Sequence, residues 1–297
     1  MPQMHETETA AAQSFEKHRR FLLGLAYRML GSLSEAEDAV QDCYLRWHQA
    51  DRAAVTNVRA YLAKTVTRLC IDRLKSARAR RETYVGSWLP EPVLEAEALS
   101  AESASEYADD LSVGLMLALE RLSPLERAAF LLHDIFDVDF AEVARLIDRN
   151  EAACRQLAAR ARTHVRAERP RFSVAPEAGA GIAAAFAGAV RSGDVDALAR
   201  LLAENAVLRS DGGGRKAAAI NPIFGRDRIA RFFAGVARKF AEPVAGSRVT
   251  PVNGLPGVIM TFSDGSLETT ALEIVDGQIV ALYVMRNPDK LAHLTRH

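Results

Sequence analysis

The sequence predicts a multidomain fold: two all-α modules, an acidic linker between them, and an α+β domain at the C-terminal end. Apolar residues recur at helical spacing from about residue 22 to residue 165. Strand-like runs separated by turn dipeptides fill the region after residue 250. The net charge is also segmented, at +5 over residues 1–81, −9 over 82–120 and +2 over 121–171. Two basic modules around an acidic segment favour a polyanionic partner, although solvated helix faces give the same pattern.

The composition of the 297-residue chain, 49% hydrophobic and 26% charged, indicates packed cores and excludes a disordered or low-complexity protein. No apolar run approaches the ~20 residues that cross a bilayer, and the first twenty residues lack a signal-peptide core. The cysteines Cys43, Cys70 and Cys154 are far apart and predict core thiols, with redox sensing as the alternative. We therefore expect a cytoplasmic protein without a metal or other cofactor.

Residues 1–81 form the first predicted module, which contains three helices. The first carries an apolar stripe and ends at Gly31, and a capping box from Ser34 to Glu37 opens the second. The third presents an aromatic ring and several cations on one exposed stripe. That arrangement suits unstacked bases and phosphates, and a plain solvated face is the alternative. The members of this stripe are Tyr61, Lys64, Arg68 and Lys75.

Residues 82–112 form the acidic linker. It contains Trp88-Leu89-Pro90-Glu91-Pro92, where two prolines in three residues preclude a regular helix. A bare linker rarely contains tryptophan, so we expect Trp88 and Leu89 to anchor this segment on a neighbouring surface. The remainder is dominated by Ala, Ser and Glu.

Residues 113–171 form the second predicted module. Ser123-Pro124-Leu125-Glu126 supplies a helix cap, a proline at the first helical position and a capping carboxylate. A short helix from Phe140 to Ile147, a polar turn and a helix from Glu151 describe a helix-turn-helix, although helix pairs also arise by chance. The outer face of the last helix carries Arg155, Arg162 and Arg166.

Residues 178–297 form the predicted α+β domain. It begins with helices, the third running from Gly225 to Phe240. The turn dipeptides Asn253-Gly254, Asp264-Gly265 and Asp276-Gly277 then separate strands in what we expect to be an antiparallel meander.

The run from Glu37 to Arg46, EDAVQDCYLR, resembles the second-helix motif of the extracytoplasmic-function (ECF) sigma factors, subunits that direct RNA polymerase to promoters. Ala60-Tyr61-Leu62 and the segment from Arg68 to Leu74 are similar to the promoter-melting region of that family. The segment from Leu122 to Arg127 and the helices after it are similar to the family's C-terminal helix-turn-helix.

The resemblance implies two partners, core RNA polymerase (its beta and beta-prime subunits) and promoter DNA. It assigns polymerase binding to Asp38, Gln41, Asp42 and Arg46. It assigns the −10 element to Tyr61, Lys64, Arg68 and Lys75. The second module is expected to read the −35 element, with Arg155 best placed for base edges and Arg162 and Arg166 for phosphates. The acidic linker is expected to lie in the RNA-exit path of the polymerase.

The chain also resembles the sigma-J-like branch of this family, which carries a fused SnoaL-like domain of the NTF2-like fold. The supporting motifs are WLPEP at 88–92, DGGGRK at 211–216 and NPDKL at 287–291. The resemblance implies that this domain regulates the sigma modules in cis. The expected regulatory contacts are Trp88, Pro90, Asp211, Gly212, Gly213, Lys216, Asn287, Asp289 and Lys290.

Two other interpretations remain open. SnoaL-like folds include cyclases and isomerases with an Asp or His base in an apolar cone, and Asp211 is the candidate base here, although Asp-Gly-Gly-Gly also suits a turn. The domain would then be catalytic or would bind an unidentified small ligand. The second alternative is a conventional dimeric transcription factor, which would need neither the polymerase-binding helix nor the Tyr-and-cation stripe.

Overall fold

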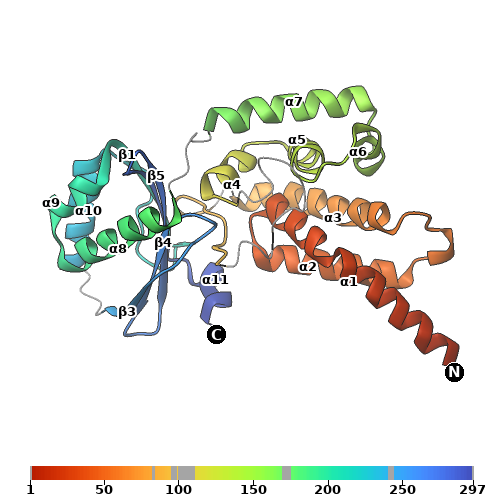
Figure 1. The fold of residues 1–297 in the computed structure, drawn as a ribbon, viewed down its shortest axis with the longest axis horizontal. Coiled ribbons are helices and arrows are strands. Elements are labelled where there is room, and N and C mark those ends of the chain that lie inside the picture. Colours follow the sequence, from red (N-terminus) through yellow and green to blue (C-terminus); the bar gives the residue numbers. More distant parts are fainter. Residues whose placement is uncertain are drawn as a thin grey trace. The chain divides into compact units, whose positions relative to one another are not determined.

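The computed structural model describes residues 2–81, 84–94, 99, 111–168, 175–239 and 244–295. The chain divides into two compact units (Figure 1), each described below by itself. The first unit combines Met1–Arg80 with Glu95–Arg169. The second combines Arg81–Leu94 with Pro170–His297, so the first part of the linker belongs with the C-terminal domain. No helix among the described residues is long and apolar enough to cross a membrane.

Three long helices form the first module: α1 (Pro2–Leu30), α2 (Leu33–Gln49) and α3 (Val58–Arg81), with a short 3-10 turn η1 (Arg52–Ala54) before α3. Gly31 has a φ of 70°, the left-handed conformation that ends helices. The predicted capping box at Ser34 is wrong. The helix begins at Leu33, and the cap is Ser32, two residues before the predicted cap; its hydroxyl accepts a hydrogen bond from the amide of Glu35.

The second module contains α4 (Val113–Glu120), α5 (Pro124–Phe130), a π-turn η3 (Leu131–Ile135), α6 (Phe140–Ile147) and α7 (Glu151–Glu168). The predicted capping box of Ser123 and Glu126 is present. The predicted polar turn is also confirmed: Asp148 ends α6 at a φ of 52°, and the side chain of Asn150 accepts a hydrogen bond from the amide of Ala153 at the start of α7.

Two buried arginines join the helical modules into one unit. The guanidinium of Arg127 donates to the carbonyl oxygen of Met29 at 2.5 Å and pairs with Glu120 at 2.7 Å. Arg28 donates to the carbonyl oxygen of Leu99 at 2.6 Å. Burial lowers the pKa of Arg127 to about 9. Removing a partner of either arginine would leave a buried donor unsatisfied, so these contacts fix how α1 and α5 pack.

The second unit contains α8 (Pro176–Ser192), α9 (Val195–Leu201) and α10 (Arg226–Lys239), followed after the sheet by α11 (Pro288–Leu291) and η4 (Ala292–Thr295). The sheet has the strand order β2-β1-β6-β5-β4-β3. Its members are β1 (Leu202–Asp211), β2 (Ile223–Phe224), β3 (Val244–Val249), β4 (Gly257–Phe262), β5 (Leu267–Val275) and β6 (Gln278–Met285). The expected meander is therefore incomplete: β3 to β6 are antiparallel neighbours, but β1 pairs parallel to β6.

The two faces of this sheet have different coverings (Figure 1). Residues directly opposite on neighbouring strands share a face. Val284 is paired with Ser210 and Thr270, and this face packs against α8 and α10 around Phe186 and Phe233. The next register position, Met285 paired with Asp211 and Thr269, lies on the opposite face, on the side of α11. The face on which a strand residue lies therefore decides whether it meets the helical core or the linker.

Candidate functional site

The predicted polymerase-binding residues lie on one face of α2. Asp38, Gln41 and Arg46 are exposed, whereas Asp42 is half-buried and pairs with Arg73 of α3 at 2.6 Å. Arg73 also donates to the backbone oxygen of Glu35 at 2.5 Å. Asp42 therefore also has a structural role, because its ion pair holds α2 against α3.

Sequence reasoning missed an apolar member of this face. Leu45 is 51% exposed and lies seven residues after Asp38 and four after Gln41, so the three side chains share a helix face. An apolar residue among polar ones is the composition found in protein interfaces that form reversibly. The available signal was the helical phase: Leu45 falls outside the buried stripe of Ala36, Val40, Cys43 and Trp47.

The predicted DNA-binding stripe on α3 makes contacts within the first unit. Lys64 pairs with Asp148 at 3.2 Å, and Arg68 pairs with the same carboxylate. These hydrogen bonds, first from Arg68 and then from Lys64, hold the pKa of Asp148 below its usual range. Tyr61 packs against the ring of Trp47, with centroids 5.6 Å apart, and is only half-buried. The turn between α6 and α7 thus pairs with two cations of the α3 stripe. The fourth member of the stripe, Lys75, pairs with Asp72 on its own helix at 3.3 Å.

The three arginines predicted on α7 have different surroundings. Arg155 is exposed, pairs with Glu151 at 3.0 Å and lies 4.7 Å from the ring centroid of Phe140. Arg166 is also exposed. Arg162 instead pairs with Asp134 of η3 at 2.5 Å, with 31% of its side chain exposed. Arg155 and Arg166 are therefore open to solvent, whereas Arg162 is held against its own module.

The residues predicted to be regulatory meet at a buried ion pair in the second unit. The ammonium of Lys290 lies 2.8 Å from Asp211, and their side chains are 10% and 0% exposed. Lys290 also donates to the carbonyl oxygen of Leu89 at 2.6 Å. The other donors to the Asp211 carboxylate are the Tyr84 hydroxyl at 2.6 Å, the Leu89 amide at 2.9 Å and the Gly213 amide at 3.0 Å. We call these residues, Tyr84, Leu89, Asp211 and Lys290, the linker anchor.

Aromatic rings and a second set of bonds complete the hold on residues 84–94. The Lys290 ammonium lies 4.3 Å from the ring centroid of Trp88 and 5.0 Å from that of Tyr84. Burial, followed by the hydrogen bond to Asp211, raises the pKa of Tyr84 above its usual range. At the other end Val93 exchanges two hydrogen bonds with Asn253, at 2.7 and 3.2 Å. His293 also contacts the carbonyl oxygen of Pro92, at 2.8 Å.

The glycine run permits a close approach of backbone and side chains. A Cβ on Gly212 would lie 2.2 Å from the backbone oxygen of Lys216. Gly213 has a φ of 61°, and its Cβ would lie 2.3 Å from the side-chain nitrogen of Asn287. Asn287 in turn donates to the Tyr84 hydroxyl at 2.9 Å. A side chain at Gly213 would therefore push Asn287 of the NPDKL segment away, and one at Gly212 would displace the backbone at Lys216.

The remaining predicted regulatory residues are placed around this centre. Pro90 is buried within the linker segment. Lys216 pairs with Asp264 at 3.0 Å, and Asp289 pairs with Arg215 at 3.0 Å in an exposed bridge. Neither Lys216 nor Arg215 is the cation on Asp211, because Lys290 occupies that place. Sequence reasoning missed Tyr84, which carries no local motif, and identified Asn253 only as a turn residue; both reach their partners in the linker only through the fold.

The position of Asp211 corrects the idea of a catalytic base in the cone. Asp211 is on the face of the sheet that meets the linker, whereas its neighbour Ser210 lines the cavity under α8 and α10. Its carboxylate already accepts four hydrogen bonds from the linker anchor and Gly213. A buried carboxylate with these partners has a structural role, and it is not placed to take a proton from a molecule in the cone.

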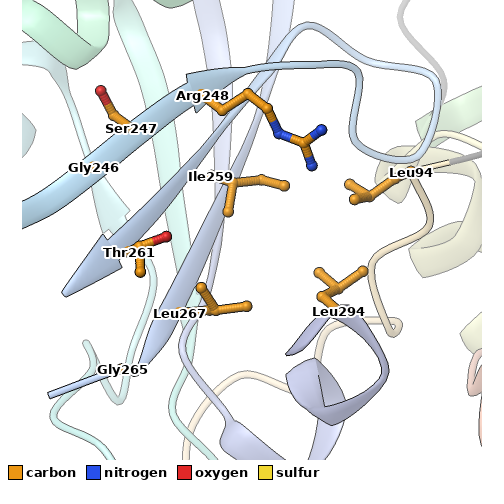
Figure 2. A pocket seen from close by; sticks show the side chains of 9 residues that line it. All are labelled: Leu94, Gly246, Ser247, Arg248, Ile259, Thr261, Gly265, Leu267 and Leu294. Carbon is orange, nitrogen blue, oxygen red and sulfur yellow. The ribbon is translucent and has the colours of Figure 1, made fainter. Parts of the chain in front are cut away.

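A cavity of about 510 Å³ lies on the same face as the linker anchor, over β3, β4 and β5. In Figure 2, Leu94 and Leu294 face Ile259 and Leu267 across it, and Arg248 extends over one side. It therefore lies where the held segment ends and where the C-terminal turn η4 packs.

The geometry of both units can now be compared with known proteins. The family model "Sigma-70 region 2" matches residues 14–80, and "Sigma-70, region 4" matches residues 112–165. These ranges correspond to the two helical modules. They define a sigma-70-type transcription factor with a region 2 module and a region 4 module.

Full-length relatives share the additional C-terminal domain. The chain is 38% identical to the ECF RNA polymerase sigma factor SigJ of Mycobacterium tuberculosis, over 93% of this chain and 91% of the relative. It is 31% identical to the probable ECF sigma factor SigI of the same species, over 97% and 96%. The crystal structure of M. tuberculosis SigJ matches with a TM-score of 0.74 and 34% identity, covering 95% of this chain and 98% of that one. The chain belongs to the ECF RNA polymerase sigma factor family.

Proposed function

We propose that this sigma factor binds core RNA polymerase through the exposed face of α2 and reads promoters with α3 and α7. We further propose that its C-terminal domain sets transcriptional output by holding the linker between the two modules, without chemical turnover. Its place of action would then be the cytoplasm, where the polymerase is. The observation that carries the regulatory part is the linker anchor: the buried ion pair of Asp211 and Lys290 holds the backbone of Leu89 from both sides.

The polymerase face is supported by its composition. Asp38, Gln41 and Arg46 leave polar groups open to solvent, and Leu45 adds an apolar contact among them. The change that tests this is Asp38→Ala with Leu45→Ser, measured as affinity for core polymerase. Both side chains are exposed, so helical content should stay constant. Glu16→Ala, which removes an exposed carboxylate on α1, is the matched control. Polymerase affinity equal to that of the parent would refute the assignment.

The regulatory part is tested by loosening the anchor without removing a buried charge. Trp88→Ala deletes a half-buried ring over Lys290 and leaves the ion pair intact. Output is measured by single-round transcription with saturating core enzyme, and we expect Trp88→Ala to change it at equal polymerase binding. Val85→Ala, an exposed position of the same segment, should leave output unchanged. Equal output from all three proteins would refute cis regulation and revive the enzyme hypothesis.

A further inference from the structure

A hollow of about 520 Å³ lies among the helices of the second unit. Each described residue that lines it comes from the end of α8, its cap Gly193, the start of α9 or α10. Arg191 and Ala237 also border the cavity under α8 and α10, but that cavity has strand residues such as Ser210 in its wall. The charged residues that line the hollow are all arginines, Arg191, Arg231 and Arg238, and we call it the arginine hollow.

Two of these arginines come from one face of α10. Arg231 and Arg238 are about two helical turns apart, so their side chains project on the same side of the helix. Ala234 lies between them on that face and is 8% exposed. A methyl group between two long side chains leaves a depression, and Arg191 borders this depression from α8.

The protein does not neutralise the three arginines. Arg191 donates to the hydroxyl of Ser247 at 3.3 Å, and the Nε of Arg231 donates to the backbone oxygen of Asp227 at 3.0 Å. Neither acceptor carries a full negative charge, and within the described ranges no carboxylate pairs with Arg191, Arg231 or Arg238. Like charges around one hollow repel each other, so this arrangement favours a bound anion.

The carboxylates nearest to these arginines in the sequence have other partners. Asp194 accepts a hydrogen bond from the amide of Ala197 at 2.9 Å and so caps α9. The carboxylate of Asp227 lies 3.9 Å from the guanidinium of Arg226. An anion in the arginine hollow would therefore meet three arginines and no acidic residue among those that line it.

We propose that the arginine hollow binds a small organic phosphate. The phosphate contacts the three guanidiniums, and the organic group packs against Val195, Ala234 and Ala237. Guanidinium groups present forked N–H donors that match phosphate oxygens, and these charge-assisted hydrogen bonds are stronger than neutral ones. A phosphate monoester carries nearly two negative charges and three acceptor oxygens near pH 7, which suits three cations better than a carboxylate does.

The size of the arginine hollow favours a small molecule over nucleic acid. Its volume falls within the range of sites that enclose small ligands. Proteins that bind duplex DNA usually contact several phosphates along an extended basic surface, whereas these arginines face one depression. The site shares no residue with the linker anchor, so it does not rest on the proposed cis regulation.

Binding is tested by calorimetric titration of the full chain with phenyl phosphate, which should bind saturably at one site. Arg231→Gln with Arg238→Gln removes two charges and should weaken binding about tenfold or more, because hydrogen bonds to charged groups are lost. The matched control, Arg200→Gln with Arg228→Gln, removes two charges outside the hollow and should change affinity less than about twofold. All four side chains are exposed, so both variants should keep the thermal midpoint of the parent. No saturable binding, or an equal loss in both double variants, would overturn the site.

The class of ligand is tested on the unmodified protein with two related anions. Benzoate keeps the ring but carries a single charge on two oxygens, and inorganic phosphate keeps the charge but lacks the ring. Both should bind more weakly than phenyl phosphate, benzoate because it accepts fewer charge-assisted hydrogen bonds and inorganic phosphate because it buries no apolar surface. Benzoate binding as tightly as phenyl phosphate would overturn the phosphate assignment. Inorganic phosphate binding as tightly would overturn the organic part and identify a site for the free ion.

Duplex DNA presents the same phosphate chemistry, and a separate titration distinguishes it from a small ligand. A short duplex without promoter elements is titrated against the parent and both double variants at low salt. We expect the two double variants to bind this duplex equally, and phenyl phosphate not to displace it from the parent. A larger loss of DNA affinity in Arg231→Gln with Arg238→Gln than in the control, without binding of phenyl phosphate, would overturn the proposal and assign these arginines to nucleic acid.

Discussion

Lys290 shows how much one side chain contributes to the second unit. Its ammonium is the cation on the fully buried Asp211, and a lone buried charge is costly. We expect Lys290→Met to lower the free energy of unfolding of this unit by about 3–5 kcal/mol. The double change Lys290→Met with Asp211→Asn should recover much of that loss. The measurement is urea unfolding followed by Trp88 fluorescence in a Trp47→Phe background, since the chain has two tryptophans.

Asp289 provides the control for that prediction. It neighbours Lys290 in the sequence, but its pair with Arg215 leaves both side chains 64% exposed. Exposed pairs contribute about 0–1 kcal/mol, so Asp289→Ala should shift the unfolding midpoint little. If Lys290→Met were as mild as Asp289→Ala, the anchor would not be a stabilising feature of the domain.

The cysteines of the first module make a second residue-scale prediction. Burial raises the pKa of both Cys43 and Cys70 to about 12, from an ordinary value of 9.0. Iodoacetamide at pH 8 should therefore leave both thiols unmodified in the folded protein and alkylate both in urea. Because the folded pKa exceeds the unfolded one, their contribution to stability is complete below pH 9 and is lost as the pH rises toward 12. Rapid native alkylation, read by mass spectrometry, would contradict this.

At the scale of elements, we expect the turn after α6 to compete with DNA for the cations of α3. Asp148→Asn keeps a residue that tolerates a positive φ, but it removes the negative charge that pairs with Lys64 and Arg68. We expect promoter-DNA affinity to rise about two- to fivefold at low salt, since exposed pairs are weak. Asp137→Asn is a close control, because Asp137 is exposed, has a φ of 55° and belongs to the same module. An equal rise for both variants would indicate a general charge effect.

On helix α7 we expect base reading and phosphate contact to belong to different arginines. Arg155→Ala should change sequence preference at the upstream element by about 1–3 kcal/mol at the contacted base pair. Arg166→Ala should instead weaken binding to all sequences and reduce the salt slope by about 1. Titrations over single-base variants at two salt concentrations measure both effects. A uniform loss from Arg155→Ala would reassign it to phosphate contact.

The elements differ in how well local sequence predicts them. The helices carry periodic stripes and caps, so their positions followed from the sequence to within a few residues. Strand β1 was missed because Leu202-Ala203-Glu204 continues the pattern of α9 with good helix formers. Its partner β6 lies more than seventy residues away, and such non-local pairing leaves no local signal. Without β1 the face of Asp211 could not be assigned, so a base in the cone stayed open as an alternative to the expected regulatory contact.

At the scale of the whole molecule, the family and the order of its parts followed from motifs, whereas the route of the chain did not. The three motifs expected to be regulatory lie in one unit, and the contacts of Lys290 with Asp211 and Leu89 join residues about 80 and 200 positions apart. Composition gives no sign that Arg81–Leu94 folds with the C-terminal domain. That assignment comes from hydrogen bonds of Val93, Leu89 and Tyr84, which require the complete sheet.

The C-terminal domain therefore includes part of the connection between the two helical modules, in addition to the residues that follow them. A chain truncated near residue 175 would lack the sheet. Leu89 and Val93, which are 2% and 6% exposed in the intact protein, would then face water. Such a fragment does not represent an unregulated sigma factor, because its linker exposes apolar side chains that the C-terminal domain covers in the intact protein. We expect it to aggregate more than a fragment in which residues 84–94 are also replaced by a Gly/Ser spacer, as light scattering would reveal. Equal solubility of the two fragments would show that the apolar side chains of residues 84–94 are covered by another part of the fragment.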